Sequence, residues 1–410
     1  MKRKLITFAL ALSIAASCSG HDPWYKIEDL SSLLTKKETT SSKDDSEEEQ
    51  ANEKWQAIAD SSLFVLTENF LNKDKGYFWS TPQDIAKSSG NIYWQQAHAM
   101  DVIISAYRRI NDSQPERAET YRNYMELWYT NYANNYNTSR KPDGEYGGFF
   151  NAYTDDMCWI CLTLCHISEA LDDEKYIRTA KNVYDNYIIS RLITDEKGSG
   201  LPWTNMEDKK GRNSCTNAPG CCLAAKLHIQ FGDKKYLDDA LTLYSYMTGN
   251  NVKADSRCEE PPLTYTQGTF GEACRLLYSI TGTSTYMDMA FKVINYAFSS
   301  SRCTTPDGIL RNEGTSMDQS IFKAVLIPYA VNLILDNSLD RESKATLRNH
   351  LIRNGEALYK SLDRSSYPKM YADYYWGTTW KPTPSAQYAS MGAQVSGTSL
   401  MEGLARLYTE

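Results

Sequence analysis

The chain has 410 residues, of which 41% are hydrophobic and 12% aromatic, and its formal net charge at pH 7 is -7. This length and apolar share are enough for a large core, and a negative charge without a basic stripe argues against a nucleic-acid partner. The 29 tyrosines and 9 tryptophans supply rings with polar edges, which suit the faces of sugars as well as helix packing.

The first residues have the pattern of a secretory signal peptide. A basic start at Lys2 to Lys4 is followed by an apolar run at 5–16, which is too short for a comfortable membrane span. Cys18 then follows small residues, as in the lipobox of bacterial lipoproteins. We expect residues 1–17 to be removed and Cys18 to carry the lipid of an exported lipoprotein at the outer membrane, cell surface or periplasm. Ordinary cleavage, giving a soluble exported protein, is the alternative.

Residues 18–51 are polar and include the acidic run from Asp44 to Glu49. This composition has too few apolar side chains to form a core, so it predicts a flexible acidic tether. The tether would let a domain at 52–410 stand off the membrane.

From residue 52 onward, apolar residues recur with helical spacing. The pattern predicts about twelve helices, at 52–71, 93–110, 115–136, 154–171, 173–191, 213–231, 233–250, 265–280, 284–300, 316–336, 340–360 and 386–409. Short turns alternate with long loops rich in Gly, Pro and Asn. This alternation predicts an all-α fold of six helical hairpins closed into an (α/α)6 barrel. A superhelical repeat array is the alternative.

The helices that follow the long loops are the more apolar ones, so we expect them to form the inner ring of the barrel. All the long loops then meet the N-terminal ends of the inner helices, where a rigid scaffold would present a binding site. Polar and aromatic residues at these ends are the candidates for substrate contacts: Trp94, Gln95, Tyr153, Asn217, Tyr265, Gln267, Gly268 and Asp318.

Different chemistry is expected of these candidates. Trp94 offers a ring to stack on a sugar, and Gln95, Asn217 and Gln267 offer amides to its hydroxyl groups. Gly268 would let the backbone pass close to the sugar. Core packing is the alternative for each of them, since a buried amide must find hydrogen-bond partners either way.

Two adjacent carboxylates, Asp155 and Asp156, stand between a Gly-rich turn at 144–148 and an apolar run at 159–167. Desolvating a carboxylate costs several kcal/mol, so such a pair needs a reason. Mutual repulsion would push their pKa values apart, as a nucleophile and a general acid require. The alternative is an Asp N-cap followed by an Asp that the helix dipole favours.

The chain has 10 cysteines, so nine remain once Cys18 is set aside. No spacing typical of a zinc site occurs, and several cysteines lie in apolar helical patterns, where Cys acts as a small buried hydrophobe. Four others could form disulfides in pairings that the sequence leaves open: Cys215, Cys258, Cys274 and Cys303. We expect a structural role for all nine.

At these same helix starts the chain resembles glycoside hydrolase family 76, the bacterial and fungal α-1,6-mannanases. The resemblance spans about residues 52–409. It is carried by the blocks at 93–101, 153–159, 213–225 and 265–271, and more loosely by 318–323. It implies an (α/α)6 barrel and a retaining, endo-acting hydrolase of α-mannan backbones that uses no metal and no cofactor.

The resemblance also implies Asp155 as the nucleophile and Asp156 as the acid/base. With its lipoprotein signal, the chain looks like a cell-surface glycan-degrading enzyme of Bacteroidetes, which would work beside other glycan-utilisation surface proteins. Two alternatives stay open: a non-catalytic glycan-binding lipoprotein on the same barrel, and a transglycosylase that shares the nucleophile.

Overall fold

A computed structural model describes residues 43–82, 92–134, 142–314, 316–361 and 390–409. The chain divides into a unit at Met1–Ser46 and a compact unit at Glu47–Glu410, and the account below concerns the second. The expected signal peptide, Cys18 and the tether up to residue 42 lie outside the described residues. Residue 386, where the last helix was expected to begin, also lies outside the described residues.

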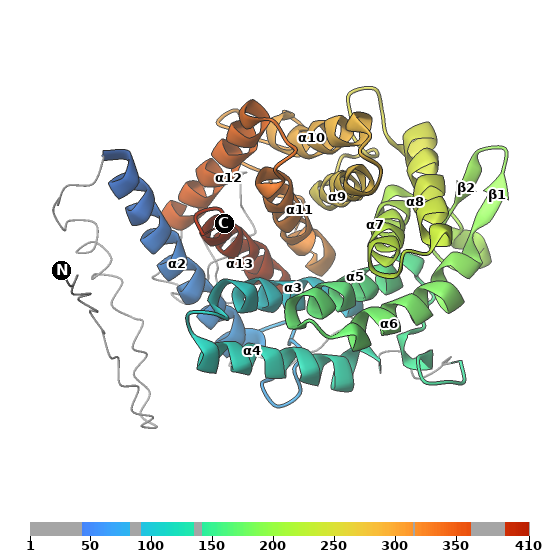
Figure 1. Cartoon of the computed structure of the whole chain (residues 1–410), viewed down its shortest axis with the longest axis horizontal. Coiled ribbons are helices and arrows are strands. Elements are labelled where there is room, and N and C mark those ends of the chain that lie inside the picture. Colours follow the sequence, from blue (N-terminus) through green and yellow to red (C-terminus); the bar gives the residue numbers. More distant parts are fainter. Residues whose placement is uncertain (1–42, 83–91, 135–141, 315, 362–389, 410) are drawn as a thin grey trace, which may run out of the picture. The chain divides into compact units, whose positions relative to one another are not determined.

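Six inner helices form a closed ring (Figure 1). Each contacts the next in chain order, and the last contacts the first. They are α3 (Tyr93–Ile110), α5 (Thr154–Leu171), α7 (Ser214–Phe231), α9 (Thr264–Thr281), α11 (Met317–Leu335) and α13 (Met391–Arg406). Ring closure excludes the superhelical array, whose ends would not meet.

Five outer helices pack against the inner helix that precedes each of them. They are α4 (Pro115–Trp128), α6 (Glu174–Val183), α8 (Lys234–Tyr246), α10 (Ser284–Ser299) and α12 (Arg341–Ser361). The sixth pair joins the two ends of the domain: in α2 (Lys43–Phe70), Ser62 donates to Thr398 of α13 at 2.8 Å. The predicted (α/α)6 barrel is confirmed.

Most helix boundaries follow the apolar pattern, and α3 and α5 begin and end where predicted. The largest difference is α2, which begins at Lys43 and so includes part of the expected tether. Residues 47–50 are exposed, as their composition requires, but their acidic side chains near a helix N-terminus favour the helical state. Three outer helices end in a π turn, at Tyr129–Ala133, Tyr184–Ile188 and Met247–Asn251.

The short turns reverse the chain at residues with left-handed backbone. Inner helices α5, α7 and α9 end at Asp172, Gly232 and Gly282, whose φ angles are 52°, 68° and 67°. Of the long loops, the one at 192–212 contains an unpredicted hairpin of β1 (Ile193–Asp195) and β2 (Gly198–Gly200), in which Thr194 pairs with Ser199. The strands are too short for the alternation by which a sequence reveals a strand.

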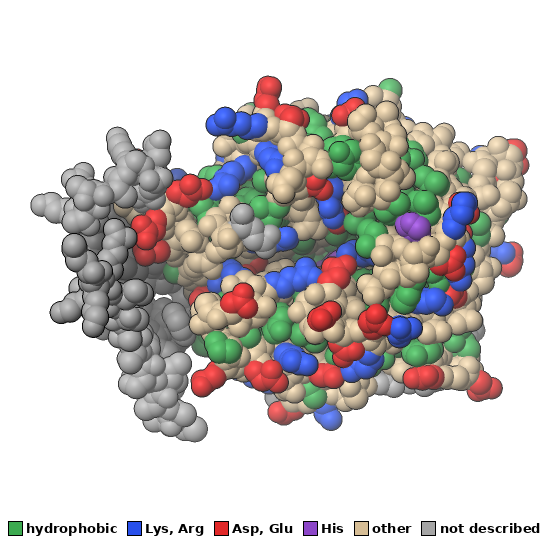
Figure 2. Space-filling model, in the orientation of Figure 1, with side chains coloured by type: hydrophobic (Ala, Val, Ile, Leu, Met, Phe, Trp, Pro, Cys, Tyr) green, Lys and Arg blue, Asp and Glu red, His purple; other side chains and the backbone are tan. Residues whose placement is uncertain are grey.

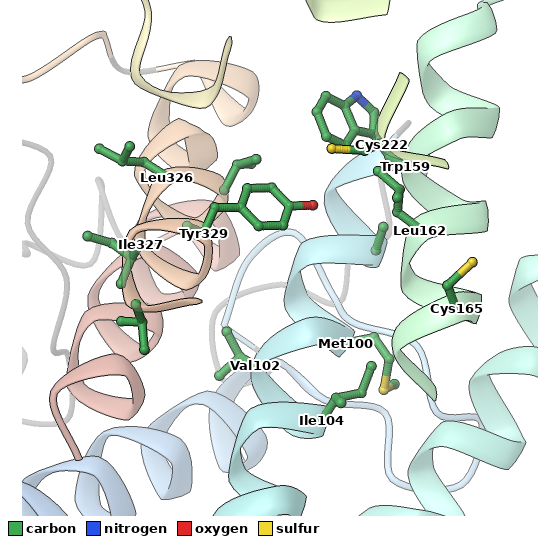
Figure 3. Close-up of a cluster of buried hydrophobic side chains, with 14 of the residues drawn as sticks. Met100, Val102, Ile104, Trp159, Leu162, Cys165, Cys222, Leu326, Ile327 and Tyr329 are labelled. Atoms are coloured by element: carbon green, nitrogen blue, oxygen red, sulfur yellow. The ribbon is translucent and has the colours of Figure 1, made fainter. Parts of the chain in front are cut away.

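The core lies between the inner and outer helices and within the ring. Figure 3 shows apolar side chains from α3, α5, α7 and α11, with the ring of Tyr329 directed away from α11 toward the α5 side. Helix α11 is long and apolar enough to cross a membrane by composition, but most of it is buried inside this barrel. Its apolar surface is therefore that of a core helix.

The barrel end at which the inner helices terminate is hollowed. A cavity of about 380 Å³ there is lined by side chains from all six inner helices, including Asp101, Glu169, Lys226, Glu272 and Arg406. In Figure 2, Lys and Arg side chains gather beside acidic ones around the hollow on this face. The long loops are at the opposite end.

Candidate active site

Both aspartates of the expected catalytic pair lie in the first turn of α5. The helix begins at Thr154, and its N-cap residue is Tyr153, which has an extended backbone and makes no side-chain cap. Neither Asp155 nor Asp156 is therefore the N-cap, so this structural explanation of the pair is wrong. The helix N-terminus still favours their negative charge.

The donors to Asp155 that the described residues supply all reach one oxygen. Its Oδ2 accepts from Nε1 of Trp203 at 3.0 Å and from Sγ of Cys215 at 3.4 Å. Its Oδ1 is buried and has no partner among the described residues. A buried carboxylate oxygen without a donor is costly, which points to a bound group that would occupy this position.

Asp156 has different surroundings. It is half-buried, and its Oδ2 accepts from Nδ2 of Asn151 at 2.9 Å. Burial raises the pKa of Asp156, and the negative charges of Asp155 and Asp318 raise it further. Burial also raises the pKa of Asp155, but the donors Cys215 and Trp203 act against that rise. A shared proton therefore favours Asp156 and leaves Asp155 ionised.

Trp203 is brought to the pair by backbone pairing. Tyr153 and Thr204 form an isolated antiparallel bridge, and the amide of Thr154 donates to the carbonyl of Trp203 at 2.8 Å. The rings of Tyr153 and Trp203 lie 5.2 Å apart at 60°. The loop before α7 is thus fastened to the start of α5.

Arg191 also holds the segment at 151–154, at the start of α5. Its guanidinium donates to the carbonyl of Asn151 at 2.7 Å, to that of Ala152 at 3.0 Å and to Oγ1 of Thr154 at 3.1 Å. Sequence reasoning missed Asn151, Arg191 and Trp203. Their only signal was a place in or beside long loops that were expected to border the site.

A second polar group joins α3 to α11. Oδ1 of Asp318 accepts from Nε1 of Trp94 at 2.9 Å and also from the side-chain amide of Gln95. Gln95 is 2% exposed and its Oε1 has no described partner, whereas Asp318 is exposed. The structure therefore brings together three of the predicted site residues.

Aromatic rings surround this second group. The ring of Trp94 lies 6.3 Å from those of Trp159 and Tyr265 and 6.2 Å from that of Phe322. Tyr265 and Phe322 stack at 4.2 Å, almost parallel at 11°. These contacts place Tyr265, another predicted site residue, beside the Asp318 group, and its side chain is also near Cys215.

Two predicted amides do not face a sugar. The side chain of Asn217 is fully buried; it accepts from the amide of Leu201 at 2.8 Å and donates to the carbonyl of Leu201 at 3.0 Å. Gln267 is also fully buried, and its amide group bonds the backbone of Ser256, Cys258 and Val293. Their predicted substrate contacts are wrong, because both side chains fasten a long loop to an inner helix.

The prediction for Gly268 also needs correction. A Cβ at this position would lie 2.6 Å from Cα of Leu326, so the absent side chain lets α9 approach α11 closely. The expected close approach of the backbone exists, but its partner is a helix and not a sugar.

All nine described cysteines are free and buried, so none of the pairings left open by the sequence forms. Cys215 differs from the other described cysteines in that its thiol contacts Asp155.

An all-α barrel with two adjacent, differently surrounded carboxylates and a group of aromatic rings beside them is the arrangement of an enzyme that acts on sugars. The model of glycosyl hydrolase family 76 matches residues 54–409. The chain belongs to this family and is a glycoside hydrolase, as the resemblance of its motifs predicted. No curated protein matches the chain.

Solved structures share the fold. One is an inactive variant of an α-1,6-mannanase of Salegentibacter sp. HEL1_6 in complex with α-1,6-mannotetrose, 23% identical with a TM-score of 0.71, covering 86% of this chain and 99% of that one. A Listeria innocua protein is 22% identical with a TM-score of 0.67, covering 86% and 97%. A family 76 mannosidase of Bacteroides thetaiotaomicron is 16% identical with a TM-score of 0.64, covering 85% and 96%.

Proposed function

We propose that this glycoside hydrolase is a retaining, endo-acting α-1,6-mannanase that cuts mannan backbones. The observation that carries the proposal is the asymmetry of the adjacent pair: two donors hold Asp155, whereas Asp156 faces two negative charges. The Salegentibacter α-1,6-mannanase supports it, since its inactive variant has two consecutively numbered aspartates replaced and binds α-1,6-mannotetrose.

In the first step Asp155 attacks the anomeric carbon and Asp156 gives its proton to the departing glycosidic oxygen. Such a mechanism works with carboxyl groups about 5–5.5 Å apart. In the second step Asp156, now ionised, takes a proton from water, and that water hydrolyses the glycosyl ester on Asp155. Two inversions at the anomeric carbon retain the α configuration.

Sugar binding falls to the residues that the structure leaves available. The rings of Trp94, Tyr153 and Tyr265, all partly exposed, offer apolar surface to sugar faces. Asp318 is exposed and offers acceptor oxygens to sugar hydroxyl groups, and Gln95 holds it in place. An acidic site of this kind suits a neutral polysaccharide such as α-mannan.

The first 18 residues support an exported lipoprotein, with the lipid on Cys18 and the enzyme at the outer membrane, cell surface or periplasm. There it would work beside other glycan-utilisation surface proteins on polymeric α-mannan.

Product analysis on unbranched α-1,6-mannan tests the proposal. The parent chain should release short oligosaccharides with α-anomeric ends, seen by NMR before mutarotation. Asp155→Asn and Asp156→Asn should release none, while the exposed hairpin control Asp195→Asn should behave like the parent. Activity in either pair variant would contradict the assignment. Binding without hydrolysis by the parent would favour the glycan-binding alternative.

Azide rescue separates the two roles. With an activated aryl α-1,6-mannobioside, azide should restore turnover of Asp156→Ala and give an α-glycosyl azide, because the Asp155 ester still forms. With Asp155→Ala, azide replaces the nucleophile and should give the β-azide. If Asp156→Ala gave the β-azide and Asp155→Ala the α-azide, Asp156 would be the nucleophile and Asp155 the acid/base.

A further inference from the structure

Cys215 is built into the site from the first turn of α7. It is 8% exposed, and its Sγ lies 3.4 Å from Oδ2 of Asp155. The side chain of Tyr265, from α9, is close enough to the same thiol to influence its pKa. Two inner helices, α5 and α7, are therefore joined at the site by a hydrogen bond from the thiol to the carboxylate.

Cys215 acts here as a donor. Burial and the charge of Asp155 raise the pKa of the Cys215 thiol well above its usual range, so the sulfur keeps its proton. Burial likewise raises the pKa of Tyr265 well above its usual range, so its hydroxyl also keeps its proton. A neutral S–H group is a weak hydrogen-bond donor. In a buried site, however, its hydrogen bond to a carboxylate is stronger than the same bond would be in water.

The second observation is the free oxygen of Asp155. Trp203 and Cys215 both occupy Oδ2, and Oδ1 is buried without a described partner. A carboxylate held by one oxygen presents the other in a fixed direction, and the unbonded oxygen keeps its full electron density.

We propose that Cys215 is a positioning residue for the glycosylation step: with Trp203 it holds Oδ2 of Asp155, so that Oδ1 is the oxygen that attacks the sugar. The inference rests on the proposed retaining mechanism. The bond from Oδ1 to the anomeric carbon forms as the glycosidic bond breaks, and the proton of Asp156 goes to the leaving oxygen.

The titratable groups that act on this assembly come from three inner helices and one loop. Asp156 shares the first turn of α5 with Asp155, Tyr265 belongs to α9, and Asp318 on α11 acts through Asp156. Glu259, in the loop before α9, adds a further negative charge near Cys215. The negative charges of Asp156, Asp318 and Glu259 oppose an ionised Asp155, whereas Trp203 and Cys215, the donors on Oδ2, favour it.

The test is the pH profile of kcat/KM on α-1,6-mannan for the full chain and for three Cys215 variants. Cys215→Ala and Cys215→Val remove the donor, the second at similar volume, and Cys215→Ser keeps a donor. Loss of the donor raises the pKa of Asp155, so the acidic limb of the profile should move to higher pH by about half a unit. The maximum of kcat/KM should fall about threefold to tenfold. In the serine variant the acidic limb should lie at the same pH as in the parent chain.

Trp203→Phe should move the same limb in the same direction, because it removes the other donor on Oδ2. The matched control is Cys221→Ala, on the same helix, whose thiol donates to the backbone of Ala240 and should leave the limb in place. An unmoved limb in both Cys215→Ala and Cys215→Val overturns the inference, as does an equal shift in Cys215→Ser. Absence of turnover by the parent chain would instead overturn the proposed function, and this inference with it.

Discussion

The two ends of the barrel place acidic residues on the same inner helices in opposite circumstances. At the end with the short turns, every acid around the cavity has a basic partner: Asp101 contacts His166 at 2.9 Å, and Glu169 contacts Lys226 at 2.6 Å. At the end with the long loops, the described residues that act on Asp155 and Asp156 are neutral donors and other acids.

The electrostatic consequences are opposite too. Burial alone would raise the pKa of Glu169, but Lys226, His166 and Arg108 together outweigh it and bring the pKa to about 2. The pKa of Asp155 and Asp156 is raised instead. Paired acids join neighbouring helices and stabilise the ring, whereas unpaired acids cost stability and gain reactivity. The comparison assigns stability to one end and chemistry to the other.

The largest effect is expected from Asp155→Asn. It should lower kcat/KM by about 10⁴-fold and yet raise the free energy of unfolding at pH 7 by about 1 kcal/mol. The folded-state pKa lies above that of the unfolded chain, so the native state binds more protons. Stability is therefore lost as pH rises from about 4 toward the folded-state pKa. Calorimetry at pH 5 and pH 8 should show the gain of the variant growing with pH. A variant less stable than the parent would contradict the claim that the unpaired acids at this end cost stability.

At the other end, Glu272→Gln should do the reverse. The side chain of Glu272 is 1% exposed and receives both Nε and Nη2 of Arg275 at 2.8 Å. Removing its charge leaves the half-buried guanidinium of Arg275 with Asp336 as its remaining described partner, so the free energy of unfolding should fall by about 3 kcal/mol. Denaturant titration measures this, and kcat/KM of the folded fraction should be unchanged. Loss of activity without loss of stability would contradict the division of roles.

Gly268→Ala tests whether this glycine serves packing. Its Cβ would lie 2.6 Å from Cα of Leu326, so the variant should lose about 1–3 kcal/mol of stability with KM unchanged. Gly249→Ala, with nothing within 4 Å of its Cβ, is the control and should be silent. A raised KM in Gly268→Ala would restore the sugar contact that the structure argues against.

The smallest effect is expected from Trp94→Phe, which keeps a ring but removes the hydrogen bond to Asp318. Asp318 would lose one of its two donors, so KM should rise about threefold to tenfold with little change in Tm. Steady-state kinetics on mannotetraose measures this. An unchanged KM would show that the position of Asp318 does not matter for sugar binding.

The fold was accessible from sequence because it depends on local patterns. Apolar periodicity gave the ends of α3 and α5, and the alternation of short turns and long loops gave the ring. The closure of α2 on α13 and the helical start at Lys43 were not accessible, since neither follows from local apolar spacing.

The site was predicted less evenly. The sequence could predict that Asp155, Asp156, Trp94 and Asp318 lie near one rim of the barrel, because the starts of the inner helices meet there. Position in the chain could not show which way an amide points. Asn217 turns back to its own loop, whereas Gln95 reaches across to α11.

Residues that act through another side chain left no such signal. Trp203 and Cys215 meet Asp155 only once two loops and two helices are assembled. A contact of this kind is a property of the fold, so a single sequence does not contain it in readable form.

Trapping of the glycosyl-enzyme tests the central claim most directly. The full chain is incubated with a 2-deoxy-2-fluoro α-1,6-mannobioside that carries a good leaving group, and the labelled peptide is mapped by mass spectrometry. The account predicts one glycosyl group per chain, on Asp155, and none in Asp155→Asn. A label on Asp156, or turnover of mannan with inverted products, would contradict it.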